Sequence, residues 1–296
     1  MNLRVLKSFL MVCRTGNITR ASELLHLSQP ALSRQIQELE EELGAPLFLR
    51  SRRQVTLTEG GLLFQKRAAA ILALAEDAAA EVRQALRSGE LAGRVRIGVV
   101  ESNAMKVLAR EIGRWRAEHP RVEFEILSAT SDSISSGLDR GTLDMGVVIE
   151  PVEVAKYESL VFPVTERWGA LVGKASALWE LDSVSLAELK AQPLILPYRS
   201  IVDDAVSGWF ENVPGTLRTA GRVSLVSNAF PLIEAGIGAA VCIEGAFAIR
   251  PSPECRFVPI EPEIRTGHRL IRRRQGRLAR APELFWNELS ALCGGA

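Results

Sequence analysis

Four polar side chains near the N-terminus have the types and spacing of a surface that recognises DNA bases. Gln29, Ser33, Arg34 and Gln37 follow one another at intervals of four, one and three residues. On a helix this spacing places them on one side. Glutamine offers a paired donor and acceptor that suit adenine, and arginine offers paired donors that suit guanine. The pattern therefore predicts contacts with base edges in a DNA groove.

Two short helices joined by a tight turn are expected to hold this surface. In the first, we predict Thr19 as the N-cap, because its hydroxyl can accept a hydrogen bond from an orphan amide; the apolar stripe is Ile18, Ala21, Leu24 and Leu25. In the second, we predict Ser28 as the N-cap and Pro30 in the first turn, where a missing amide proton costs little; the stripe is Leu32, Ile36, Leu39 and Leu43. Gly44 fits a C-terminal cap. In a helix-turn-helix, the start of the second helix meets base edges.

A basic, β-rich segment follows the two helices. Arg50, Arg52 and Arg53 precede Val55-Thr56-Leu57, which is typical of a wing whose cations lie on backbone phosphates. The formal net charge is only +1, so nucleic-acid binding has to depend on such local clusters. On spacing alone, a helical hairpin with a solvated polar face explains the segment equally well.

The segment from Ala21 to Arg50, A-S-E-L-L-H-L-S-Q-P-A-L-S-R-Q-I-Q-E-L-E-E-E-L-G-A-P-L-F-L-R, resembles the N-terminal domain of LysR-type transcriptional regulators almost position by position. The resemblance implies a winged helix-turn-helix over residues 1–58 that binds double-stranded DNA at a dyad-symmetric operator. The candidate DNA-binding residues are Thr19, Gln29, Pro30, Ala31, Ser33, Arg34, Gln37, Arg50, Arg52 and Arg53.

A long helix is expected next, over residues 59–89. Thr56 and Glu59 fit a capping box, with Thr58 as a competing cap, and Ser88-Gly89 would end the helix. Its stripe has steps of four and three, as in a coiled coil: Phe64, Ala68, Ile71, Ala75, Ala78, Val82 and Ala85. Packing on its own domain is the commoner use of such a stripe. We favour packing on a second copy, and the resemblance implies the same dimerisation helix, within a homodimer or homotetramer. Gly60 and Gly61 would mark a hinge or a frayed start.

From residue 90 onward, predicted strands alternate with helices, which indicates an α/β fold with a parallel sheet. The expected strands are Val95–Val100, Val122–Leu127, Met145–Ile149, Gly169–Val172, Leu194–Leu196, Thr219–Val223 and Ala239–Cys242. Pieces such as H-P-R-V-E-F-E-I and I-E-A-G-I-G-A-A-V resemble the LysR effector domain. The resemblance implies a two-lobed, periplasmic-binding-protein-like (type 2) effector-binding domain over residues 90–296. Lobe one would be 90–162 plus 266–296 and lobe two 163–265, with crossings near Phe162-Pro163 and Pro259 to Arg265.

Ligands of open α/β sheets bind at the carboxyl ends of the strands. The candidate effector-binding residues follow predicted strands: Ser102, Asn103, Thr130, Ser131, Ser133, Tyr198, Arg199, Ser200, Ser227 and Asn228. Helix starts favour anions, so we expect a small-molecule effector with a carboxylate favoured and Arg199 as its charge partner. Glu101 opposes that expectation, because it would repel a carboxylate. Each Ser or Asn also has a plainer explanation as a helix cap.

Other signals point away from catalysis. The residues His26, His119 and His268 are far apart, so no metal site is expected, and neither a catalytic constellation nor a cofactor motif appears. The four cysteines suggest reduced core residues rather than a disulfide framework. Neither a secretion signal nor a membrane-spanning run is found, so we expect a cytoplasmic transcriptional regulator that is not an enzyme. Two alternatives stay open: a solute-binding or enzymatic α/β protein with an N-terminal assembly domain, and a nucleoid-type architectural protein.

Overall fold

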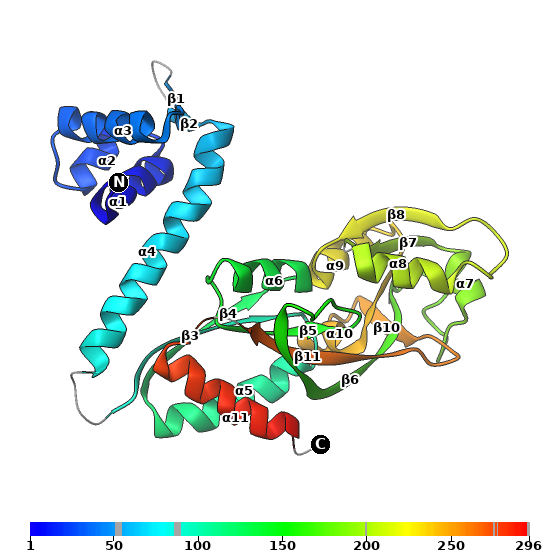
Figure 1. The fold of residues 1–296 in the computed structure, drawn as a ribbon. Coiled ribbons are helices and arrows are strands. Elements are labelled where there is room, and N and C mark those ends of the chain that lie inside the picture. The colour runs from blue at the N-terminus through cyan, green and yellow to red at the C-terminus, as the bar shows by residue number, and fades with distance from the viewer. Residues whose placement is uncertain (51–54, 86–89, 199, 275, 277, 295–296) are drawn as a thin grey trace. The chain divides into compact units, whose positions relative to one another are not determined.

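The structure, a computed structural model, describes residues 1–50, 55–85, 90–198, 200–274, 276 and 278–294. The chain divides into two units, Met1–Leu86 and Arg87–Ala296, and each is described by itself (Figure 1). Among the described residues, no helix has the length and apolar character needed to cross a membrane.

The first unit is a winged helix-turn-helix followed by a long helix. Its elements are α1 (Leu3–Thr15), α2 (Ile18–Leu24), α3 (Gln29–Leu43), β1 (Phe48–Arg50), β2 (Val55–Leu57) and α4 (Glu59–Ala85). The strands β1 and β2 pair antiparallel, with Phe48 opposite Leu57. Helices α1, α2 and α3 enclose a core in which Phe9, Leu32 and Ile36 are fully buried, and the aromatic rings of Phe9 and Phe48 lie 5.2 Å apart. This core fixes the orientation of α3 against the wing.

The caps of α2 and α3 explain where the helices begin and end. Ser28 is the N-cap of α3, and its Oγ accepts from the amide of Ala31 at 3.3 Å, as the sequence predicts. Gly44 ends α3 in the left-handed region with φ of 67°. The prediction for α2 was wrong: Asn17, not Thr19, is the N-cap, and its Oδ1 accepts from the amide of Arg20 at 3.0 Å. The helix begins earlier than expected because an asparagine already satisfies the first free amides.

One residue of each predicted apolar stripe is exposed. Leu24 at the end of α2 is 48% exposed, and Leu43 at the end of α3 is 40% exposed. Leu25, the last member of the α2 stripe, still packs against the core, so only the α3 stripe stops before its helix ends.

Helix α4 begins against the wing. The Oγ1 of Thr58 accepts from the amide of Gly61 at 2.9 Å, so Thr58 is the cap, rather than Thr56. Gly61 is buried, and a Cβ at this position would overlap the carbonyl oxygen of Leu47. This glycine therefore permits a close approach of two backbone segments. The sequence analysis had predicted a hinge or a frayed helix start at this position instead.

In the first half of α4, apolar side chains pack into the core of the first unit. Ala68 and Leu72 are buried in the core of that unit, and Phe64 packs against it. Further along, Ile71, Leu74 and Val82 are exposed. Ala85, the last predicted member of the stripe, ends the helix.

The second unit contains two lobes, which we define by the predicted ranges, 90–162 plus 266–296 for lobe one and 163–265 for lobe two. The strands are β3 (Ala92–Val99), β4 (Arg121–Ser128), β5 (Met145–Ile149), β6 (Tyr157–Gly173), β7 (Pro193–Pro197), β8 (Arg218–Val223), β9 (Ala239–Ile243), β10 (Cys255–Pro259) and β11 (Arg265–Arg273). The helices are α5 (Ala104–Glu118), α6 (Ser131–Asp139), α7 (Leu186–Lys190), α8 (Ser200–Trp209), η1 (Val226–Asn228), α9 (Ala229–Glu234), α10 (Glu244–Ile249) and α11 (Arg280–Gly294).

The sheet is mixed and runs through both lobes in the order β4-β3-β5-β11-β6-β9-β7-β8, with β10 added beside β6. The pairs β3–β4 and β3–β5 in lobe one are parallel, as are β7–β8 and β7–β9 in lobe two. The predicted parallel pairing is therefore confirmed within each lobe, but at the centre β6 and β11 run antiparallel to their neighbours, which the sequence did not predict. These two long strands connect the lobes (Figure 1), and the β6–β11 pairing shifts between Gly267 and His268.

Each lobe has helices on both faces of its part of the sheet (Figure 1). In lobe one, Phe285 and Trp286 of α11 are buried together with Leu108 of α5 in one core. In lobe two, alternate strand residues face opposite sides, since Val241 belongs to one core and Cys242 to another. The carboxyl ends of β3, β7 and β9 are thereby positioned at the boundary between the lobes.

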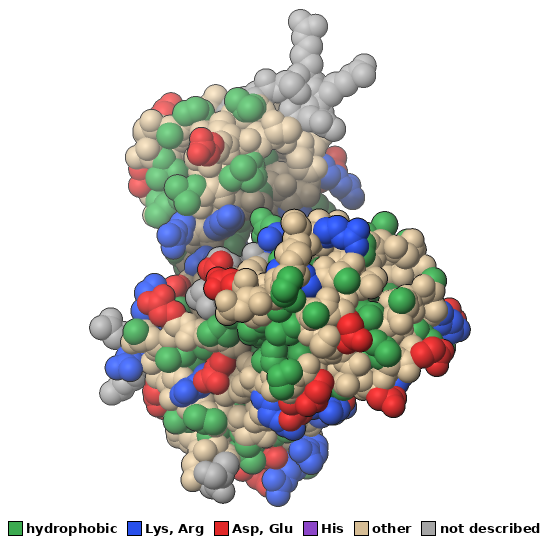
Figure 2. Space-filling view, turned by 90° about the vertical axis from the view of Figure 1, so that its right-hand side faces the viewer, with side chains coloured by type: hydrophobic (Ala, Val, Ile, Leu, Met, Phe, Trp, Pro, Cys, Tyr) green, Lys and Arg blue, Asp and Glu red, His purple; other side chains and the backbone are tan. Residues whose placement is uncertain are grey.

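Two arginines of β11 are paired with acids within lobe one. Arg269 pairs with Glu150 at 2.7 Å, and Arg272 lies between Glu158 and Glu283, 4.6 Å above the Trp286 ring. Acidic and basic side chains are also interspersed over the face shown in Figure 2. The two paired arginines therefore stabilise lobe one.

Candidate functional site

The N-terminal end of α3 presents the predicted base-recognising side chains to solvent. Gln29, Pro30, Ala31, Arg34 and Gln37 are exposed, and Ser33 is half-buried. Opposite them Leu32, Ile36 and Leu39 fill the core, so the polar side has no role in packing within this unit. Thr19 is exposed on α2. This arrangement is suited to insertion of α3 into a major groove.

Arg34 is a highly exposed charged residue on this surface. Its side chain is 81% exposed, and its Nε donates to Oε1 of Glu38 at 2.8 Å, one turn further along. An exposed pair of this kind contributes little to stability, so the arginine is available for another acceptor. Arg50 ends β1, opposite Val55, while Arg52 and Arg53 lie outside the described residues.

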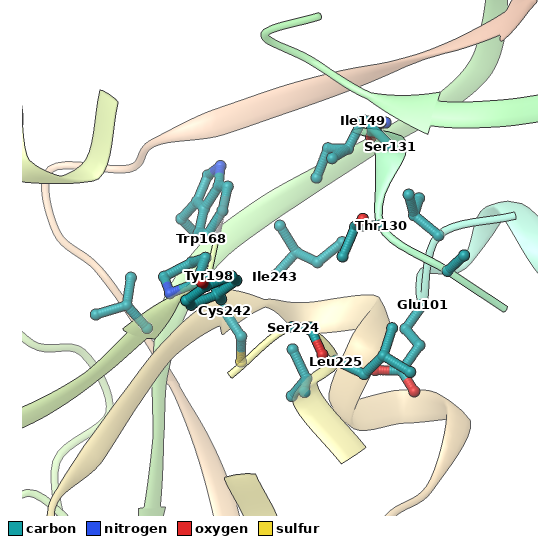
Figure 3. A pocket seen from close by; sticks show the side chains of 15 residues that line it. Glu101, Thr130, Ser131, Ile149, Trp168, Tyr198, Ser224, Leu225, Cys242 and Ile243 are labelled. Carbon is teal, nitrogen blue, oxygen red and sulfur yellow. Dashed lines mark hydrogen bonds between the residues drawn. The ribbon is translucent and has the colours of Figure 1, made fainter. Parts of the chain in front are cut away.

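A cavity of about 100 Å³ lies between the two lobes. Lobe one contributes Ile149, Ser131 and Thr130, on the right in Figure 3, and lobe two contributes Trp168, Tyr198 and Cys242 opposite them. The surface of the cavity is almost entirely apolar. Its lining residues are Val100, Glu101, Ala129, Thr130, Ser131, Ile149, Trp168, Pro197, Tyr198, Ser224, Leu225, Val226, Val241, Cys242 and Ile243.

Three of the predicted effector residues line this cavity, namely Thr130, Ser131 and Tyr198. Two of them also serve the fold. Thr130 caps α6, because its Oγ1 accepts from the amide of Ser133 at 3.2 Å. Ser131 is buried, and its Oγ accepts from the amide of Ile149 at 3.4 Å.

The other predicted effector residues are not among those that line the cavity. Ser102 is buried and its Oγ accepts from the amide of Ala104 at 3.2 Å, while Ser133 and Asn228 are exposed. Ser200 begins α8, and Arg199 lies outside the described residues. The plainer explanation as a helix cap applies to Thr130, whereas Asn103 and Asn228 occupy N-cap positions without a side-chain cap hydrogen bond.

The start of α5 is occupied by a carboxylate of the chain itself. Glu166 on β6 is 2% exposed. Its Oε1 accepts from the amide of Asn103 at 2.6 Å, and its Oε2 accepts from the Asn103 Nδ2 at 3.1 Å and from the amide of Gly245 at 2.7 Å. One buried side chain thus joins the beginnings of α5 in lobe one and α10 in lobe two. Helix starts favour a negative charge, which explains how a buried carboxylate is stabilised there.

A second carboxylate bridges the lobes at the cavity itself. Glu101 follows β3 in lobe one, and its Oε2 accepts from the amide of Ser227 in η1 of lobe two at 3.1 Å. Beside the cavity, burial raises the pKa of the Cys242 thiol to about 12, and Glu166 and Glu101 add to this effect. Cys242 is therefore an uncharged thiol at neutral pH.

Sequence reasoning did not find Glu166, Trp168 or Cys242 as parts of this site. Cys242 ends a predicted strand, so the rule that ligands meet strand ends could have found it. Glu166 and Trp168 lie inside the long strand β6, of which the sequence analysis recognised only the last part. Among the described residues, no group of His, Cys, Asp and Glu side chains is arranged to hold a metal ion.

Two family models match the chain. The model described as "Bacterial regulatory helix-turn-helix protein, lysR family" matches residues 3–62, and the model "LysR substrate binding domain" matches residues 88–294. The chain is 30% identical over 270 residues to the uncharacterized HTH-type transcriptional regulator YnfL of Escherichia coli (strain K12), which covers 88% of each protein. It is 32% identical over 250 residues to the HTH-type transcriptional regulator BudR of Raoultella terrigena, covering 81% of this chain and 84% of BudR.

Solved structures agree over the full length. The LysR family transcriptional regulator CbnR superposes with a TM-score of 0.80 at 26% identity, covering 99% of both chains. Full-length CbnR in complex with its target DNA gives a TM-score of 0.77 at 25% identity, covering 100% of this chain and 99% of that one. These relatives are transcriptional regulators.

Proposed function

Because this chain belongs to the LysR family of transcriptional regulators, we propose that α3 and the wing bind a dyad-symmetric operator while the interlobe cleft senses the effector. As a member of this family, the chain is a DNA-binding transcriptional regulator with a domain that binds a small molecule. The observation that supports the placement of the DNA interface is the exposed polar side of α3, which the core leaves free.

The proposed interface keeps the residues predicted from the sequence. On α3, Gln29, Ser33, Arg34 and Gln37 would meet base edges, with Pro30 and Ala31 in apolar contact. Thr19 and the wing arginines Arg50, Arg52 and Arg53 would contact phosphates. The domain boundaries that accompany this proposal are 1–58 for DNA binding, 59–89 for the linker helix and 90–296 for the effector domain.

Self-association through α4 is part of the proposal. Four exposed apolar side chains lie within one arc of the helix, Leu63, Ile71, Leu74 and Val82, and we name them the α4 stripe. A continuous exposed apolar surface of this kind marks an interaction site in a soluble protein, and a dyad-symmetric operator needs two copies of α3. Leu74→Glu should therefore convert the oligomer to a monomer in sedimentation experiments. An unchanged mass would rule out the α4 stripe as the interface.

We place the regulator with the chromosome in the cytoplasm and assign it no catalytic activity. The regulators that the chain resembles support both proposals.

Arg34→Ala tests the assignment of α3 as the base-recognising helix. An operator is first selected from a random duplex pool with the purified full-length chain, and Kd is then measured for the operator and for a scrambled duplex. Loss of one bidentate base contact costs about 1–3 kcal/mol, so the Kd for the operator should rise about 5- to 150-fold, with a much smaller change for the scrambled duplex. Arg4→Ala in α1 removes an exposed charge from the same unit and should leave the ratio of the two Kd values unchanged.

Arg52→Ala tests the wing by contrast. Removal of a phosphate contact should weaken both duplexes alike and lower the slope of log K against log salt by about 1. If Arg34→Ala leaves discrimination intact, the assignment of α3 is wrong.

A further inference from the structure

Three backbone amides at helix starts beside the interlobe cleft already donate to carboxylates of the chain. The amides of Asn103 and Gly245 donate to Glu166 at 2.6 and 2.7 Å, and the amide of Ser227 donates to Glu101 at 3.1 Å. Amides at helix starts are the groups that would attract an anionic ligand. In this chain these three amides are used to join lobe one to lobe two.

The cavity beside these bonds is apolar on nearly all of its surface. Aliphatic and aromatic side chains from both lobes line it, among them Val100, Ile149, Trp168 and Ile243 (Figure 3). The hydroxyls of Thr130 and Ser131 already accept hydrogen bonds from backbone amides. A ligand here therefore gains mainly from burial of apolar surface.

Among the described residues that line the cavity, the charged one is an acid. Glu101 is one of its lining residues, and a carboxylate ligand would lie close to it in surroundings where charges repel strongly. A second hollow, which shares Trp168 with the first, contains two arginines. Both are paired, Arg269 with Glu150 at 2.7 Å and Arg265 with Glu263 at 2.8 Å. The described cations near the cleft are thus neutralised by the chain's own acids.

We propose that the effector of this regulator is a small uncharged molecule, mostly apolar, whose apolar part is bound in the cavity between Trp168 and Ile149. This proposal rests on the proposed function and names the ligand class of the same cleft. The cavity measures about 100 Å³ and opens to solvent, so it takes an apolar group the size of a small ring or a branched alkyl chain, with the polar end of the ligand at the opening. The carboxylate favoured by the sequence analysis is thereby replaced by a neutral ligand.

The test compares probes that share a carbon skeleton and differ in charge. Benzyl alcohol is paired with benzoate, and 2-methylpropan-1-ol with 2-methylpropanoate. Each is titrated into the full-length chain while thermal unfolding is followed. A probe at ten times its Kd should raise Tm by about 3–5 °C. We expect this for at least one alcohol and for neither carboxylate.

The thiol of Cys242 gives a second, local measurement. Because this thiol is buried and uncharged at neutral pH, iodoacetamide reaches it only when the cleft opens transiently, so alkylation is followed by peptide mass spectrometry over hours at alkaline pH, where more of the exposed thiol ionises. Cys255 is the internal control, because it is also buried but does not line the cavity. A bound alcohol at ten times its Kd should slow alkylation of Cys242 about tenfold and leave Cys255 unaffected. In Ala129→Leu, whose added side chain fills the cavity, the protection should disappear.

The outcomes separate the ligand class from the function. Carboxylates that bind as tightly as the alcohols would overturn the neutral ligand and leave the sensor role intact. If none of the four probes protects Cys242, the cavity is not a binding site of this class. The operator measurements with Arg34→Ala then decide independently whether the chain is the regulator proposed above.

Discussion

Gly245→Ala should destabilise the effector unit far more than an ordinary glycine substitution in a helix. Gly245 lies in the first turn of α10, where its amide donates to Glu166. A Cβ at this position would overlap both Oε1 of Glu166 and the amide nitrogen of Asn103. The methyl group and the carboxylate cannot occupy the same space, so the carboxylate must leave the two helix starts that it joins.

The magnitude follows from the bonds that would be lost. A hydrogen bond to a charged group contributes about 1.5–3 kcal/mol, and Gly245→Ala disturbs two of them, from Asn103 and from Gly245 itself. Hydration of the displaced carboxylate and relaxation of α10 recover part of this free energy. We therefore expect the free energy of unfolding to fall by about 2–4 kcal/mol. For a unit of this size the loss corresponds to a fall in Tm of roughly 5–15 °C.

The matched control is Gly113→Ala. Gly113 is an exposed glycine within α5 of the same unit, and a Cβ there would meet no atom within 4 Å. Alanine is favoured over glycine inside a helix by roughly 0.5–1 kcal/mol, so this variant should be slightly stabilised. Calorimetry of the full-length chain measures both variants and the unaltered protein side by side.

Glu166→Gln separates charge from shape. The carboxamide keeps the volume of the side chain, but its NH₂ group must face one of the amide donors, so it should lose about 1.5–3 kcal/mol without any steric overlap. In the Glu166→Ala background, Gly245→Ala should cost at least about 1 kcal/mol less than it does alone, since contacting residues are not additive. If Gly245→Ala unfolds at the same temperature as Gly113→Ala, Glu166 does not join the lobes as the hydrogen bonds indicate.

Two further predictions concern the wing and the strand that connects the lobes. Gly61→Ala should lower the Tm of the DNA-binding unit by several degrees, because the added Cβ overlaps the Leu47 carbonyl oxygen, whereas Gly60→Ala meets only ordinary contacts; equal melting of the two variants would contradict the close approach. Burial lowers the pKa of His268 below its ordinary value near 6.5. The His268 imidazole is therefore protonated near pH 6.5 in the unfolded chain but only at lower pH in the folded chain. The free energy of unfolding consequently falls as pH drops below about 6.5, by up to about 1.4 kcal/mol per pH unit. The fall in Tm between pH 7 and pH 5.5 should be smaller in His268→Gln, and an identical fall would exclude His268 as its source.

The sequence predicted the parts of this fold that depend on local patterns. The cap at Ser28, the left-handed Gly44 and the strand Met145–Ile149 were all found where they were expected. Each depends on a property of a short segment: a hydroxyl beside free amides, a residue without a Cβ, or a continuous buried apolar run.

The parts that were missed depend on partners far away in the chain. The long strand β6 contains Glu158, Thr165, Glu166 and Arg167, which do not form an apolar run. It is stabilised by pairing with β11, about 100 residues later. Likewise, nothing near Asn103 in sequence indicates that Glu166 takes the place of an anionic ligand at the start of α5. The carboxylate expectation depended on free amides, and only the tertiary structure shows which amides are free.

The same contacts decide how a ligand can act on this regulator. A ligand shifts a conformational equilibrium only through different affinities for the two states. Here Glu101 and Glu166 already join the lobes through hydrogen bonds to Ser227, Asn103 and Gly245, so closure does not depend on the ligand alone. A molecule that buries its apolar surface between Trp168 and Ile149 adds that burial to these bonds and therefore favours the closed lobes.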